Sequence, residues 1–172
     1  MAESGRLRTD EGTKQLYTLE QRRRRDASPW TLVQGVLAPL QFLVFLVSLA
    51  LILRYLATGE GLYAANGSIV AKTVLLYTIM ITGSVWEKDV FGRWLFASAF
   101  FWEDVVSMLV LALHTAYLVC LLQGLLGSNE LLFLALAAYA TYVVNAAQFI
   151  LKLRAARLSG RSTIDNAFEA AR

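Results

Sequence analysis

Residues 32–53 read LVQGVLAPLQFLVFLVSLALIL, a run of 22 residues without one charged side chain. Its members that are polar or unusual in a helix are Gln34, Pro39, Gln41 and Ser48. A helix crosses the hydrocarbon core of a bilayer with about 20 mostly apolar residues. The run therefore predicts a transmembrane helix. It is too long, and begins too far along the chain, for the apolar region of a cleavable signal peptide.

Three further apolar stretches follow, at 69–85, 105–126 and 131–153. The chain has 172 residues, of which 57% are hydrophobic, a larger share than soluble domains usually carry. We therefore expect an all-α polytopic membrane protein, a bundle of four transmembrane helices with a polar interior. The expected organisation is a basic N-terminal tail (1–28), a transmembrane domain (29–156) and a C-terminal tail (157–172).

Lysine and arginine are concentrated on one side of the expected membrane. The basic residues that flank the spans on this side are Arg22–Arg25, Lys88, Arg93, Lys152, Arg154, Arg157 and Arg161. The loops 57–68 and 127–130 contain neither lysine nor arginine. The positive-inside rule then places both termini and the middle loop in the cytoplasm. Beside membrane spans, such residues indicate a lipid surface and no nucleic-acid partner.

Each expected span carries polar side chains at spacings that share one helix face. The four sets are Gln34, Gln41 and Ser48; Thr73, Tyr77, Ser84 and Glu87; Glu103, Ser107, His114 and Tyr117; and Thr141, Asn145, Gln148 and Lys152. Lipid cannot satisfy these groups, so the four faces should turn inward. There they either line a ligand site or form hydrogen bonds between helices.

Four carboxyl groups gather at the cytoplasmic ends of the second and third spans. They are Glu87, Asp89, Glu103 and Asp104, and they stand among aromatic residues that include Trp86 and Trp102. One interpretation is an interfacial aromatic belt with solvated loop charges. The other is a site for a large, flat, apolar ligand that needs proton chemistry at one edge. The connecting stretch 91–102 is apolar enough to fold back toward the bilayer.

His114 is the single histidine, about 16 Å along the helix from Glu103. One histidine cannot make a protein metal site, so we expect no metal bound by the protein alone. His114 could instead be the axial ligand of a metal that arrives inside a macrocycle, or a hydrogen-bonded structural residue. Lys72, near the start of the second span, is expected to extend to the membrane interface.

Several long segments resemble the 3-vinyl bacteriochlorophyllide hydratase family of photosynthetic bacteria. They are QRRRRDASPWTLVQGVLAPLQFLVFLVSLALILRYLATGEG (21–61), LYTIMITGSVWEK (76–88), FFWEDVVSMLVLALHTAYL (100–118) and LAAYATYVVNAAQF (136–149). The similarity covers about residues 17–158. It implies a hydro-lyase that adds water to the C3 vinyl group of chlorophyllide a or a bacteriochlorophyllide, giving a 1-hydroxyethyl group in bacteriochlorophyll a biosynthesis.

The resemblance further implies a multi-pass protein of the bacterial inner or intracytoplasmic photosynthetic membrane. No cofactor is expected, since the substrate carries its own magnesium. The expected partners are the chlorophyllide substrate and the lipid bilayer; homo-oligomers and contacts with other enzymes of bacteriochlorophyll synthesis stay open. The family offers no motif with settled catalytic roles, so no site residue is transferred from it.

The residues themselves suggest roles for such a reaction, which needs a general acid, a positioned water and an apolar slot. We expect Glu103 or Asp104 to be the acid and Glu87 or Asp89 to orient water. His114 would bind the substrate magnesium or anchor a hydrogen bond. The remaining substrate-binding candidates are Tyr117, Tyr77, Trp102, Trp86, Asn145 and Gln148.

Two other functions fit the same features. A carrier or assembly protein of the photosynthetic membrane would hold a chlorin without changing it, using the same histidine and aromatic residues. A small transporter subunit would show helices broken at mid-membrane, for which Pro39 is the only hint.

Overall fold

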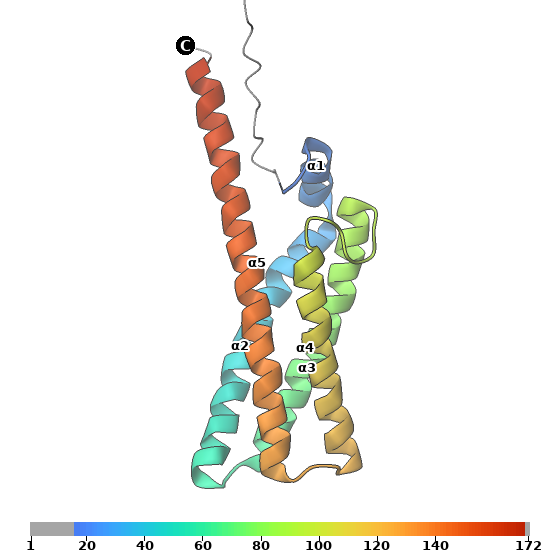
Figure 1. Cartoon of the computed structure of the whole chain (residues 1–172), viewed down its shortest axis with the longest axis vertical. Coiled ribbons are helices and arrows are strands. Elements are labelled where there is room, and N and C mark those ends of the chain that lie inside the picture. The colour runs from blue at the N-terminus through green and yellow to red at the C-terminus, as the bar shows by residue number, and fades with distance from the viewer. Residues whose placement is uncertain (1–15, 171–172) are drawn as a thin grey trace, which may run out of the picture.

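The computed structural model describes residues 16–170, with side chains from Leu16 to Ala155. The described chain forms five helices and no strand, which confirms the expected all-α fold. The helices are α1 (Leu19–Ala27), α2 (Pro29–Thr58), α3 (Leu62–Phe91), α4 (Phe101–Gln123) and α5 (Ser128–Ala170). Figure 1 shows α2 to α5 running side by side, with α1 lying across one end of the bundle.

Helices α2 to α5 are each long and apolar enough to cross a membrane, which confirms the four expected spans. All begin several residues before the apolar runs that predicted them, because polar turns can extend a helix beyond the hydrocarbon core. Helices α2 and α3 have 30 residues each, or about 45 Å, against a core of about 30 Å. Only α4 ends early, at Gln123 instead of residue 126, because Gly124 follows in the left-handed conformation (φ 62°) and terminates the helix.

The bundle consists of two helical hairpins. Helices α2 and α3 pack together along their length, as do α4 and α5, whereas contacts between the two hairpins are much sparser. Short connections at 59–61 and 124–127 close the hairpins at one end of the molecule. The seam between the hairpins is where the polar side chains of the interior meet.

Apolar side chains fill the half of the seam nearest the short connections. Ile52, Ile69, Tyr117 and Leu132 are fully buried there and belong to one cluster. The outward faces of the helices are also apolar; Leu122, for example, is 83% exposed. Apolar surface on this scale indicates contact with lipid.

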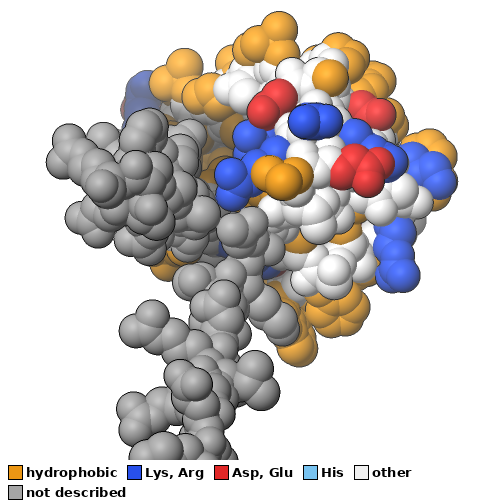
Figure 2. Space-filling view, turned by 90° about the horizontal axis from the view of Figure 1, so that it is seen from above, with side chains coloured by type: hydrophobic (Ala, Val, Ile, Leu, Met, Phe, Trp, Pro, Cys, Tyr) orange, Lys and Arg blue, Asp and Glu red, His pale blue; other side chains and the backbone are white. Residues whose placement is uncertain are grey.

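We call the opposite end, formed by α1, the α3–α4 loop and the upper part of α5, the basic end. Figure 2 looks onto it and shows lysine, arginine and acidic side chains in the middle with hydrophobic residues around the rim. A capping box of Thr18 and Gln21 begins α1. Tyr17, just before it, is buried against Phe91. Burial raises the pKa of the Tyr17 phenol, and the nearby Arg25 opposes this shift.

Helix α5 continues beyond its expected span. The apolar run ends near residue 153, but the helix extends to Ala170 and projects from the bundle (Figure 1). Part of the expected C-terminal tail is therefore helical, while most of the basic N-terminal tail, residues 1–15, lies outside the described residues.

Candidate active site

Glu87 and Asp104 form a buried acidic pair at the basic end. Glu87 comes from the last turns of α3 and Asp104 from the first turn of α4, and they are 5% and 4% exposed. Their carboxyl groups are close enough to act on each other. Two carboxyl groups at close range can share one proton, since a protonated carboxyl group donates and an ionised one accepts. The pair is therefore a candidate store for a proton at a place with little access to water.

The loop 92–100 fixes both carboxyl groups through its backbone. The Phe96 N–H donates to Asp104 Oδ2 over 2.8 Å, and the Ala97 N–H donates to Glu87 Oε2 over 3.2 Å. Phe96 has φ 58°, an uncommon conformation for a residue other than glycine. This backbone turn aims two successive N–H groups at the pair. The loop folds back onto the bundle, with Ala97 buried.

An aromatic cluster closes the space beside the pair. Phe100, which is 2% exposed, stacks on Phe149 at 5.8 Å and meets Trp86 and Phe91 edge-on at 5.8 and 5.9 Å. The Trp86 indole N–H donates to Thr31 Oγ1 over 2.9 Å, so its ring is fixed in orientation. Together these rings form an apolar cluster at the same end of the bundle as the acidic pair.

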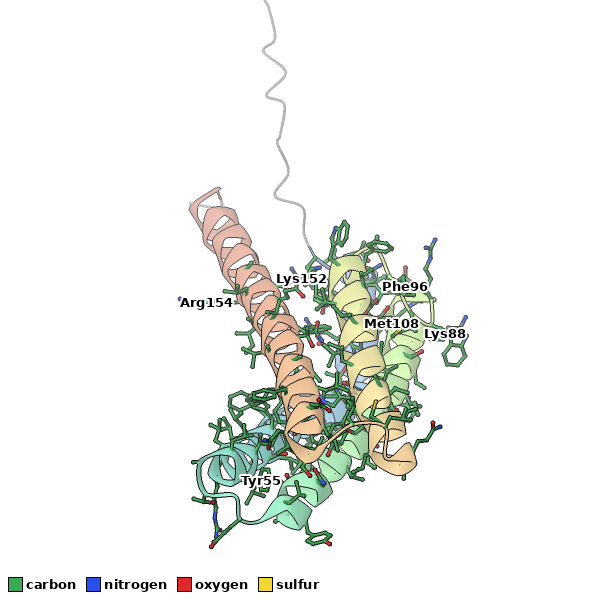
Figure 3. The ribbon with its side chains drawn as sticks, turned by 60° about the horizontal axis from the view of Figure 1, so that its bottom comes forward. Tyr55, Lys88, Phe96, Met108, Lys152 and Arg154 are labelled. Atoms are coloured by element: carbon green, nitrogen blue, oxygen red, sulfur yellow. The ribbon has the colours of Figure 1, made fainter. Side chains whose placement is uncertain are left out.

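Glu103 has a different environment from that of its neighbour Asp104. The Lys152 ammonium group lies 2.5 Å from Glu103 Oε2 and 5.1 Å from the centre of the Phe100 ring. Figure 3 shows Lys152 on α5 and Phe96 on the loop at the same end of the bundle. Glu103 is therefore held by a lysine of α5, whereas Asp104 is held by the backbone of the loop.

Polar groups continue from Glu103 toward the middle of the bundle between α4 and α5. Asn145 Nδ2 donates to Ser107 Oγ over 2.8 Å. The side-chain carbonyl oxygens of Asn145 and Gln148 are buried and have no hydrogen-bond partner in the described part of the chain. Buried acceptors without a donor are uncommon in native proteins and point to a missing ligand or water.

His114 lies fully buried near the middle of α4. Its Nδ1 is 2.8 Å from the Val110 carbonyl oxygen, which can only accept, so the ring proton of a neutral His114 is on Nδ1. The lone pair on Nε2 is then free, and no described residue donates to it. The ring stacks on Tyr139 at 5.8 Å, and Tyr139 donates to Ser48 over 2.7 Å. A rigidly held imidazole with an unused lone pair can bind a metal.

Lys72 does not extend to the membrane interface, so that expectation was wrong. The residue is fully buried, and its Nζ lies 3.6 Å from the centre of the Tyr142 ring. Lys72 is ten residues into α3, about 15 Å from the helix end, and its stem turns into the bundle instead. Its charge is close enough to act on His114. Lys72 is the residue that sequence reasoning left out of the site.

The other predicted site residues lie in varied places. Tyr117 is buried and donates to Asn66 over 2.9 Å, and Tyr77 shares a 2.8 Å hydrogen bond with Thr115. Trp102 is 69% exposed and faces outward. Asp89 is exposed beside an open depression of about 460 Å³ at the basic end, so the structure does not bring it to the acidic pair. Among the described residues, no three histidine, cysteine or acidic side chains gather as metal ligands.

The fold defines a polytopic helical membrane protein. Its interior holds acidic, histidine and lysine side chains among aromatic and aliphatic residues. The family model of 2-vinyl bacteriochlorophyllide hydratase matches residues 17–155. The chain belongs to this family, as its sequence indicated. The family name gives the ring position of the vinyl group as 2, whereas the sequence analysis above gives it as C3.

Two similar proteins show the same relationship. The chain is 65% identical over 149 residues to the 2-vinyl bacteriochlorophyllide hydratase of Rhodobacter capsulatus, covering 87% of this chain and 86% of the relative. It is 66% identical over 145 residues to the protein of the same name from Cereibacter sphaeroides, covering 84% and 90%. No solved structure matches the chain.

Proposed function

We propose that this protein hydrates the vinyl group of a bacteriochlorophyllide and that the Glu87–Asp104 pair supplies the proton. Family membership over most of the chain supports the reaction. The observation that carries the chemistry is the buried carboxyl pair held by the backbone of the loop 92–100, at the end of the bundle where aromatic rings cluster. Acid-catalysed hydration of an alkene requires such a proton donor in an apolar setting.

The reaction balances without a redox step. A proton adds to the terminal vinyl carbon, and the neighbouring carbon becomes a cation stabilised by the macrocycle. Water attacks that carbon and releases one proton, which leaves a 1-hydroxyethyl group. The pair donates one proton and regains one, so it is ready for another cycle.

The helix ends favour Glu87 as the donor of this pair. Asp104 lies in the first turn of α4, where the helix dipole stabilises a negative charge, and Glu87 lies near the C-terminal end of α3, where it does not. Asp104 then stays ionised and can take up the proton released by water, with Glu103 as a second acceptor nearby. In this scheme the loop 92–100 orients both carboxyl groups.

Deeper in the bundle, His114 would hold the substrate. Its free Nε2 suits the central magnesium of the macrocycle, and the unpartnered oxygens of Asn145 and Gln148 suit donors on the substrate or on water. The proposed location is the cytoplasmic membrane of a photosynthetic bacterium, with the basic end facing the cytoplasm. The basic residues flanking the helices at this end support that orientation.

The test is to incubate membranes that contain the protein with chlorophyllide a. We expect conversion to the 1-hydroxyethyl product, with an absorption band shifted to shorter wavelength. In D₂O, the product should carry one carbon-bound deuterium, on its new methyl group. Binding of chlorophyllide without product would overturn the proposal in favour of the chlorin carrier.

Asp104→Asn tests the proton source in the same assay. The asparagine can still accept the Phe96 N–H, but it cannot share a proton with Glu87 as a carboxylate does. We expect turnover to fall by about 10²- to 10⁴-fold. The matched control is Glu60→Gln, which removes an exposed carboxylate near the short α2–α3 connection and should leave turnover unchanged. Wild-type turnover in Asp104→Asn would refute the assignment.

A further inference from the structure

Lys72 is a buried amine without an acidic partner among the described residues. Its Nζ is buried, contacts the face of Tyr142 and has no hydrogen-bond partner among the described side chains. The ion pairs found within residues 16–155 do not include it. An ammonium group in the interior of a membrane protein is normally paired, and it marks a functional site.

Among residues 16–155, no acidic group lies at the level of Lys72. The next acid along α3 is Glu87, fifteen residues or about 22 Å away along the helix. On α4 the acids lie in the first turn, about 15 Å from His114. Helix α2 has no acidic residue, and Glu130 is exposed at the start of α5. An anion at this level must therefore come from a ligand.

We infer that Lys72 binds a carboxylate of the substrate, an inference that rests on the proposed function. A bacteriochlorophyllide is the free acid of its pigment: its propionate side chain is not esterified with a long-chain alcohol. That carboxylate is the one strong negative charge on an otherwise apolar molecule. A buried ammonium ion on an aromatic face is a complementary partner for it.

The three groups follow one another along the bundle in an order that suits one bound macrocycle. Lys72 and His114 are close enough to interact electrostatically, so a ring whose magnesium is near His114 could place its propionate at Lys72. The acidic pair lies farther toward the basic end. Anchoring of the propionate at Lys72 would thus direct the vinyl group toward the acids.

This arrangement makes Lys72 a specificity-determining residue that selects the free acid over esterified pigment. The experiment compares chlorophyllide a with its methyl ester, for the wild type and for Lys72→Met. The wild type should show a KM at least about tenfold lower for the free acid. Lys72→Met should raise KM for the free acid to near that of the ester and leave the ester's KM unchanged. The two substrates partition differently into membranes. The quantity compared is therefore the ratio of the ester's KM to the free acid's KM, measured for the wild type and for Lys72→Met.

Two further variants strengthen the test. Lys88→Met removes an exposed lysine of α3, which Figure 3 shows pointing away from the bundle, and should keep the wild-type ratio. Lys72→Arg keeps the charge and should keep a preference for the free acid. The amount of folded protein is checked in each case by size-exclusion chromatography in detergent.

The outcomes separate this inference from the proposed function. A preference for the free acid that is equally large in the wild type and in Lys72→Met would overturn the inference while leaving the hydratase in place. Absence of hydration of both substrates by the wild type would instead refute the proposed function. If Lys72→Met does not fold, Lys72→Gln replaces it in the same comparison of KM ratios.

Discussion

The backbone of the loop 92–100 holds both Glu87 and Asp104, which are 17 positions apart in the chain, by donating one N–H to each carboxyl group. In the proposed mechanism the loop is therefore part of the site, and the acid chemistry would depend on backbone geometry as much as on the two side chains.

Because the pair shares one proton, its members should act as a unit. Glu87→Gln and Asp104→Asn should each lower turnover by about 10²- to 10⁴-fold, and the double variant should be little worse than either alone. The measurement is kcat for chlorophyllide a in membranes with equal amounts of protein. Losses that multiply in the double variant would show that the two groups act independently.

The strained turn at Phe96 predicts opposite results for two substitutions. Phe96→Gly removes the penalty of a side chain at φ 58°, about 1 kcal/mol, and should keep thermal stability and activity near those of the wild type. Phe96→Val places a β-branched side chain in the same conformation, so stability and turnover should both fall. Thermal unfolding in detergent and the hydration assay check this. Equal behaviour of the two variants would mean that this backbone turn does not limit the site.

The ion pair of Lys152 and Glu103 should contribute measurably to the free energy of unfolding. Their side chains are 26% and 9% exposed, so removal of the ammonium group leaves a mostly buried carboxylate without a partner. Lys152→Met should therefore destabilise the protein by about 1–3 kcal/mol, less than a fully buried pair because of solvent screening. Glu103→Gln added to Lys152→Met should recover part of the loss. If the double variant is less stable than Lys152→Met, charge burial is not the cause.

The sequence predicted the four spans because apolar runs of this length have few alternatives in water or lipid. It could not show the loop contacts to Glu87 and Asp104, which come from backbone N–H groups and leave no side-chain pattern. The sequence could, however, have separated Glu87 from Asp89. Glu87 and Asp89 are two positions apart and thus about 200° apart around a helix, so both cannot face the interior.

Lys72 was missed for a different reason. A lysine near the beginning of an apolar run usually extends to the interface, and the run seemed to begin at residue 69. Helix α3 begins at Leu62, seven residues earlier, so Lys72 lies one to two turns deeper than expected. Its neighbour Thr73 is also fully buried. Thr73 was already assigned to the polar face of the helix, which indicated that this turn of α3 faces inward.

The last prediction concerns His114 and the substrate's metal. If Nε2 binds the central magnesium, the wild type should prefer chlorophyllide a over its magnesium-free counterpart, and His114→Phe should lose that preference. Phenylalanine can keep the stacking on Tyr139, and the Val110 carbonyl keeps its place in the helix, so the fold should be preserved. The readouts are KM for both substrates and the shift of the pigment absorption band on binding, which axial ligation changes and simple packing does not. His114→Phe with the wild-type preference and band shift would show that the imidazole has a structural role only.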